Sequence, residues 1–381
     1  MRAAFIFNFI LIFVYKGFLL LWLVVGFLSI EPAFAMNNRC SAPVFGVSNV
    51  SIDQRAKTAA MARDLGVRKA AEHAFSTVLD RVLLSNEERS RFMDSHDLDD
   101  FSDFTHIVNE NNLDQRYIAT LDFCFDPTRL RKAMISAQLS WAELQSPPIL
   151  VIPVWRGPDG ARAWDRDNKW ISGWWDKVSS YNGLLSFRKL DRNLINERQF
   201  RGEDLVLASV EKLTRAANLV DAEQVMLVVA SLDYDGSNPL ITITVQLFDK
   251  NGQIITDILF DDHVVGKSAV LKNLDLIRQK IISQMDTSWH ITNLIDDTTT
   301  DYITVLMPIT SIKEWTERLK ALDKIAMVQS YDILLLNTQA GRVFIRFAGS
   351  REALQNALAA HRLQLLDNGN DYLISVKPSN G

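Results

Sequence analysis

The sequence is poor in cysteine, with only Cys40 and Cys124 among its 381 residues. Two cysteines this far apart form neither a C-x-x-C redox pair nor a four-ligand zinc site. An oxidising compartment would permit one disulfide between them, which closes a loop of about 84 residues and stabilises the fold by roughly 4 to 5 kcal/mol in the chain-entropy model. The alternative is two buried thiols that are not linked, because sequence does not show that the β-carbons meet.

The sequence also lacks a strong charge bias. Its 41 basic and 46 acidic residues leave a net charge of −5, and they form no long run of one sign. A protein that binds nucleic acid needs a basic face to neutralise phosphates. Nucleic acid is therefore not expected as a partner.

Complete catalytic and metal-binding motifs are missing as well. The six histidines are dispersed, and neither H-E-x-x-H nor G-x-S-x-G occurs. Residues 266–268 resemble the end of a phosphate-binding loop, but Asp261 stands where that loop needs glycine. A calcium-loop pattern starts at Ser231 and fails at Thr242, where the last ligand should be glutamate. We expect no cofactor, no metal and no enzymatic activity, and an enzyme of unrecognised type is the third hypothesis because triads also assemble from distant residues.

The N-terminus, in contrast, carries a clear pattern. Lys16 precedes an apolar run, Gly17–Ile30, and a break at Pro32 leads to the small-residue motif that ends at Ala35. This order is typical of a secretory signal, cleaved after Ala35, and the run is shorter than the ~20 residues of a membrane span. We expect a periplasmic protein. The alternative is an inner-membrane protein anchored by an uncleaved N-terminal helix, which is the one case in which membrane contact is expected.

Periodicity and turn residues divide the chain into α+β modules. The two prolines after Ser146 end the first module, and the polar run 296–301 separates the last one. The predicted division is a signal peptide (1–35), an N-terminal α+β domain (36–145), a middle α/β domain (146–290), a linker (291–301) and a C-terminal domain (302–381).

Each module has its own predicted pattern. In the first, a long amphipathic helix over 56–84 precedes strands, the last of them 117–125. The middle module is predicted as an α/β sheet with antiparallel hairpins, one of which turns at Asn251 and Gly252. A single helix is expected from Glu203 to about Asn218. The last module has the ferredoxin-like order βαββαβ, a scaffold that hosts many unrelated functions.

Five tryptophans lie close together between Val154 and Val178. If Asn168 caps a helix, one face of that helix gathers apolar side chains, and we predict a packing stripe of Trp170, Ile171, Trp174, Trp175 and Val178. Trp155, at a strand end, and Trp164, in a loop, lie outside this stripe. These two are the candidate binding surface.

The same region resembles a family of secreted bacterial proteins. The segments YIATLDFCFDPTRLRKAM and PPILVIPVW, followed by a W-x-x-x-N-x-W-x-x-x-W pattern, are similar to domain-of-unknown-function family number 2066, in its alphaproteobacterial type. The pattern is matched by Trp164, Asn168, Trp170 and Trp174. In the C-terminal domain Trp315, the helix ALQNALAAHRLQLL and the strand DYLISV resemble the family too. The family has no assigned activity, so the resemblance implies no catalytic residues.

The middle domain separately looks like the N-terminal α/β modules of TolB-type envelope proteins. Its opening strand ILVIPVW and its hairpin ITITVQLFDKNGQIITDILF carry that likeness. Such modules bind other components of envelope assemblies. The leading hypothesis is therefore a non-catalytic periplasmic protein that binds another envelope protein. The alternative is a module that binds glycan or peptidoglycan with exposed tryptophans.

Overall fold

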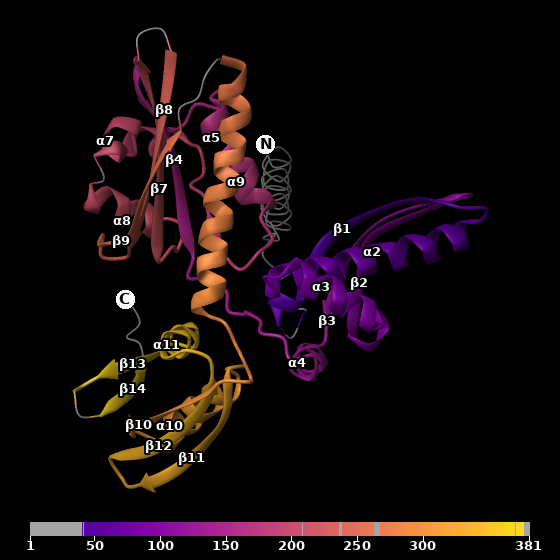
Figure 1. The fold of residues 1–381 in the computed structure, drawn as a ribbon, viewed down its shortest axis with the longest axis vertical. Helices are drawn as coiled ribbons and strands as arrows, with labels where there is room; N and C mark the ends of the chain where they lie inside the picture. Colours follow the sequence, from indigo (N-terminus) through magenta and orange to yellow (C-terminus); the bar gives the residue numbers. More distant parts are fainter. Residues whose placement is uncertain are drawn as a thin grey trace, which may run out of the picture.

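The computed structural model describes residues 40, 42–207, 209–235, 238–262, 267–369 and 371–376. The protein is an α+β chain with three separate sheets, as expected from the sequence (Figure 1). The predicted cleavage site at Ala35 lies outside the described residues. None of the described helices is long and apolar enough to cross a membrane.

The N-terminal module is a three-stranded antiparallel sheet with one long helix on it. The sheet order is β1-β3-β2, and alternate side chains of β3, such as Tyr117 and Leu121, pack under α2. Thr58 caps α2 by accepting from the amide of Met61. The elements are η2 (Pro43–Phe45), β1 (Gly46–Arg55), α2 (Ala59–Val82), α3 (Asn86–Ser95), η3 (Leu98–Asp100), β2 (Ser102–Leu113), β3 (Arg116–Phe125) and α4 (Pro127–Ser136).

The middle module is a sheet covered by helices on both faces. Its order is β5-β4-β7-β8-β9, with β4 parallel to β7 and to β6 and the remaining pairs antiparallel. Helices α5 and α9 cover one face, and α7 and α8 cover the other. The elements are β4 (Ile149–Gly157), β5 (Gly160–Arg162), α5 (Lys169–Ser180), β6 (Phe187–Arg188), α6 (Leu194–Gln199), α7 (Gly202–Val206), α8 (Val210–Asn218), β7 (Gln224–Asp235), β8 (Asn238–Asp249), β9 (Ile254–Asp262) and α9 (Lys267–Thr292).

The C-terminal module has the predicted βαββαβ order, followed by one more strand. That strand, β14, lies between β10 and β13 and runs parallel to β10, so the sheet order is β11-β12-β10-β14-β13. Both helices pack on the same face of this sheet. The elements are β10 (Thr300–Pro308), α10 (Ile312–Asp323), β11 (Val328–Leu336), β12 (Ala340–Ala348), α11 (Arg351–Ala360), β13 (Leu363–Asp367) and β14 (Tyr372–Val376).

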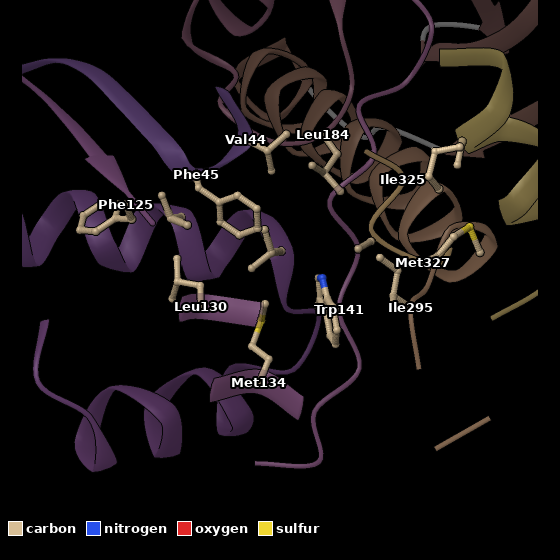
Figure 2. Packing of buried hydrophobic residues seen from close by; sticks show 14 of the residues in the cluster. Val44, Phe45, Phe125, Leu130, Met134, Trp141, Leu184, Ile295, Ile325 and Met327 are labelled. Atoms are coloured by element: carbon tan, nitrogen blue, oxygen red, sulfur yellow. The ribbon is translucent and has the colours of Figure 1, made fainter. Parts of the chain in front are cut away.

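The modules meet at the end of α9, where side chains from distant parts of the sequence form one core. Figure 2 shows Phe45, Trp141, Ile295 and Met327 in this cluster. Trp141 and Ile295 form a two-residue antiparallel bridge, with both backbone amides donating to the other residue's carbonyl oxygen. Ile295 belongs to the predicted linker, and it is buried here rather than exposed to solvent.

Candidate protein-binding surface

The predicted tryptophan stripe lies on α5, which Asn168 caps by accepting from the amides of Trp170 and Ile171. Trp170, Ile171 and Trp174 are fully buried. The indole rings of Trp170 and Trp174 meet edge to face, with their centres 5.7 Å apart. Trp175 and Val178 are partly buried against the same core. All five side chains therefore face the middle sheet and do not form a ligand platform.

Trp155 and Trp164 are both half-buried. Trp155 packs against the core under α5 and α9, and Trp164 packs against the core on the opposite face of the sheet. The indole Nε1 of Trp164 donates a 2.8 Å hydrogen bond to the carbonyl oxygen of Phe200. Neither ring is exposed as a stacking surface.

Cys40 and Cys124 form a disulfide, with their α-carbons 5.4 Å apart. The bond ties the first described residue to the end of β3. Gly46 lies against it, because a β-carbon at that position would be 2.6 Å from the Cys40 sulfur. This cross-link is a structural element of the N-terminal module.

A polar network fills the junction between the N-terminal and middle modules. The buried guanidinium of Arg81, on α2, donates to backbone carbonyls of Val44 and Gly46 and to both oxygens of Asn182. Burial lowers the pKa of Arg81 to about 10, because desolvation disfavours the charged form. The carbonyl of Arg81 accepts from Nε2 of His290 at 2.7 Å. The network joins α2 to the loop after α5 and to α9.

A second part of this junction centres on Asp286 of α9. Its carboxylate accepts a hydrogen bond from the hydroxyl of Tyr181. Burial, and then the charge of Asp286, raise the pKa of Tyr181 well above its ordinary value. The tyrosine thus stays protonated and acts as a donor. Every group of this network has a partner inside the protein, which fits a role in holding modules together.

An open groove of about 890 Å³ runs beside the same junction. Its walls come from the segment between the first two modules, from α9 and from α11, and they include Pro147, Trp289, Asn356 and Arg362. Trp289 donates from its indole nitrogen to the carbonyl of Leu144, and Asn356 donates to the side chain of Asn293. These polar groups are engaged in contacts between modules and do not converge on the groove.

The uncovered face of the C-terminal sheet differs from these packed regions. Directly paired residues of antiparallel strands point to the same face, and three cross-strand rows point away from α10 and α11. The rows are Tyr302–Arg346–Ser330, Thr304–Phe344–Asp332 and Leu306–Arg342–Leu335. We call these nine residues the open face.

The open face combines exposed aromatic and aliphatic groups with arginines. The side chain of Tyr302 is 65% exposed, and its ring lies 5.7 Å from that of Phe344. The guanidinium of Arg346 lies over the Phe344 ring at 5.4 Å and is 3.3 Å from the carboxylate of Asp332. Tyrosine and arginine are the residue types that dominate binding energy at protein interfaces. Sequence analysis did not single out these residues, although the alternation in β10 and β12 marks them as one face.

Among the described residues there is no group of three or more histidine, cysteine, aspartate or glutamate side chains that could hold a metal ion. The residues of the failed phosphate-loop pattern at 266–268 lie partly outside the described chain. Ser231, where the calcium pattern starts, lies within β7, which pairs along its length with β8. The segments on either side of the calcium-loop pattern are thus the two strands of a hairpin, whereas a calcium loop of this type lies between two helices.

No family model and no curated protein matches the chain. Two of the solved structures that match parts of this chain are a domain of LpoB and a bacterial lipoprotein. The C-terminal domain of LpoB from Salmonella enterica matches with 18% identity and a TM-score of 0.23, over 32% of this chain and 84% of that domain. Lipoprotein GNA1162 from Neisseria meningitidis matches with 12% identity and a TM-score of 0.23, over 37% of this chain and 96% of its own. Likenesses at this level do not indicate function, and the resemblance to family 2066 stays a prediction.

Proposed function

We propose that this chain is an exported, non-catalytic envelope protein that binds another protein in the periplasm through the open face of its C-terminal module. The secretory-signal pattern predicted for residues 1–35 supports the location. The open face supports the binding role, because it is the uncovered side of a two-layer module and presents aromatic, aliphatic and arginine side chains together.

The observation that supports this proposal most directly is the exposure of Tyr302 on the open face. A partner that covers an aromatic side chain this exposed is stabilised in the complex by about 25 cal/mol per Å² of apolar surface that is buried. The ring of Phe344 lies beside Tyr302, while Arg342 and Arg346 supply polar contacts at the rim of the open face. A folded protein segment offers both kinds of contact over such an area.

Site-specific photo-crosslinking in living cells tests the proposal. A photoreactive residue is placed at Tyr302, and a matched control carries it at Ile254, a similarly exposed residue on β9 of the middle module. We expect position 302 to yield a discrete crosslinked envelope protein that position 254 does not. Equal crosslinking at both positions, or none at 302, contradicts the proposed surface.

A glycan-binding module is the second candidate, and the Tyr302–Phe344 ring pair is the observation that favours it. Sugar rings stack on exposed aromatic faces, and Tyr302 is exposed, whereas Trp155 and Trp164 are half-buried. Calorimetric titration with cell-wall fragments distinguishes the candidates. Heat of binding that disappears in Tyr302→Ala supports the glycan role, whereas no heat with any fragment removes it.

A further inference from the structure

The edge strand β11 exposes a continuous apolar stretch. Ile333 is 45% exposed, and Leu334, Leu335 and Leu336 are each 57% exposed. At the outer edge of the C-terminal sheet, β11 pairs with β12 on one side, and within the described chain no strand pairs with its other side. The stretch therefore combines aliphatic side chains with unpaired backbone groups, which is the combination that recruits another strand.

The other edge strands are protected by charge or by shortness. β1 carries Asp53 and Arg55, β9 carries Asp257, and β2 carries Asp103 and Glu110. The remaining edges, β5, β6 and β13, are only three, two and five residues long. Natural proteins use such devices to prevent association at edges. The second half of β11 is neither charged nor short, so its free edge is open to pairing.

A bulge in β11 decides which side chains share a face. Ile333 pairs with Val343 and Leu336 pairs with Gly341, with a register shift between them. Because residues 341 and 343 are two apart on β12, their side chains point to the same face, and so do Ile333 and Leu336. That face is the one covered by helices, where the ring of Trp315 packs on Gly341. Without the bulge, residues three apart would point to opposite faces.

This arrangement is self-complementary. In an antiparallel pair of two β11 strands related by a two-fold axis, Ile333 of one copy lies opposite Leu336 of the other, and the two share a face as pairing requires. Leu334 and Leu335 then meet at the axis. The nearest charge, Asp332, falls opposite the neutral Asn337 of the other copy, so no like charges oppose one another.

We propose that two copies of this chain pair through β11 and join their C-terminal sheets into one continuous sheet. The contact buries the aliphatic stretch of both copies and pairs their free edges. It also sets the two open faces side by side, because a two-fold axis perpendicular to a sheet keeps equivalent faces on the same side. The inference goes beyond the proposed function and does not depend on it.

Sedimentation velocity of the purified chain, in the form that cells export, tests the pairing. We expect a concentration-dependent dimer with a dissociation constant on the order of micromolar, as is usual for a small interface. Leu336→Lys should raise that constant roughly tenfold or more, since it places a charge in an apolar contact. Ile254→Lys is the matched control, because Ile254 is 54% exposed on the edge strand β9, and it should leave the dimer unchanged.

Cysteine pairing tests the register separately. The described native cysteines are both bonded to each other, so an added cysteine is the reactive thiol. A mixture of Ile333→Cys and Leu336→Cys chains should form linked dimers faster than either variant alone. Circular dichroism confirms that each variant is folded. A chain that stays monomeric at all concentrations, a dimer unaffected by Leu336→Lys, or equal linking of mixed and single variants overturns the proposal.

Discussion

Single residues hold the start of the described chain in place. The disulfide between Cys40 and Cys124 ties it to β3, and Arg81 binds the carbonyl oxygens of Val44 and Gly46 just after it. Both interactions join residues that are far apart in the sequence. Cys40 and residues 42–46 thus depend on the rest of their module for their position.

Replacing both cysteines by serine should lower the free energy of unfolding by roughly 2 to 5 kcal/mol, because the cross-link restricts an 84-residue loop in the unfolded chain. Chemical denaturation of the double variant beside the native chain measures the difference. The reduced native chain is the control and should match the variant. An unchanged midpoint in both would show that the disulfide contributes nothing to stability.

The carboxylate of Asp126 makes part of the stability of the fold depend on pH in the acid range. It caps α4 by accepting from the amides of Thr128 and Arg129. The backbone bond from Arg129, with further bonds from its side chain and from Thr128, lowers the pKa of Asp126. A folded pKa below the unfolded one means that this stabilisation is complete above about pH 4 and is lost as the pH falls through the folded pKa.

We expect Asp126→Ala to cost about 1 kcal/mol at neutral pH, and the gap to the native chain to close as the pH falls below about 4. Asp126→Asn keeps the capping oxygen but not the charge, so its smaller loss should vary less with pH. Denaturation at a series of pH values measures all three chains. A loss in Asp126→Ala that stays constant down to pH 2 would contradict the assignment.

At the scale of elements, the packing of α5 against α9 depends on a glycine. A β-carbon on Gly173 would lie 2.4 Å from the guanidinium carbon of Arg278. That guanidinium is held by the carbonyl of Lys169 and by Asp275, and it lies 5.7 Å from the centre of the Trp170 ring. Glycine usually weakens a helix. Here it makes room for an arginine from the neighbouring helix.

Gly173→Ala should therefore destabilise the chain by about 1 to 2 kcal/mol, even though alanine favours helix by roughly 1 kcal/mol over glycine. In an Arg278→Ala background the same change should become neutral or stabilising. A double-mutant cycle of unfolding free energies measures this coupling. A gain in stability from Gly173→Ala in the native background would show that Arg278 moves away without cost.

Elements also show where local patterns stop being informative. The cap and the periodicity predicted α5 with Asn168 at its N-terminus, because both signals depend on neighbours within one or two turns. The single helix predicted from Glu203 to Asn218 is wrong, since the structure has α7 and α8 with a break after Val206. The break lets Leu205 and Leu213 both reach the core while Leu207 is exposed. Periodicity alone does not reveal this change of axis.

At the scale of the whole molecule, the end of α9 connects the modules. His290 reaches Arg81 of the first module, Trp289 reaches the segment between the first two, and Asn293 meets α11 of the third. Figure 1 shows α9 running along the middle sheet toward this meeting point. Cooperative unfolding of the modules is therefore expected to depend on a few contacts at one place.

Arg81→Ala should loosen this connection, because it leaves buried carbonyl oxygens without donors at a cost of about 1 to 3 kcal/mol each. We expect scanning calorimetry to show a broader transition, or two separate ones. Arg63→Ala is the control on the same helix, since Arg63 is half-exposed and its contacts, among them a 3.8 Å ion pair with Glu110, stay within the N-terminal module. Identical melting curves for both variants would contradict a coupling role for Arg81.

The sequence by itself determined the α+β class, most of the helices and strands, several caps and the expectation of export, because each depends on residues close together in the chain. Only the tertiary structure decided which tryptophans are buried, why Gly173 is needed, and that Ile295 of the predicted linker is part of a core. It also decided that Tyr302 and the end of β11 are exposed. The exposure of a side chain depends on which distant elements cover it. The strand register across a sheet decides which elements those are, and a local sequence pattern does not contain this information.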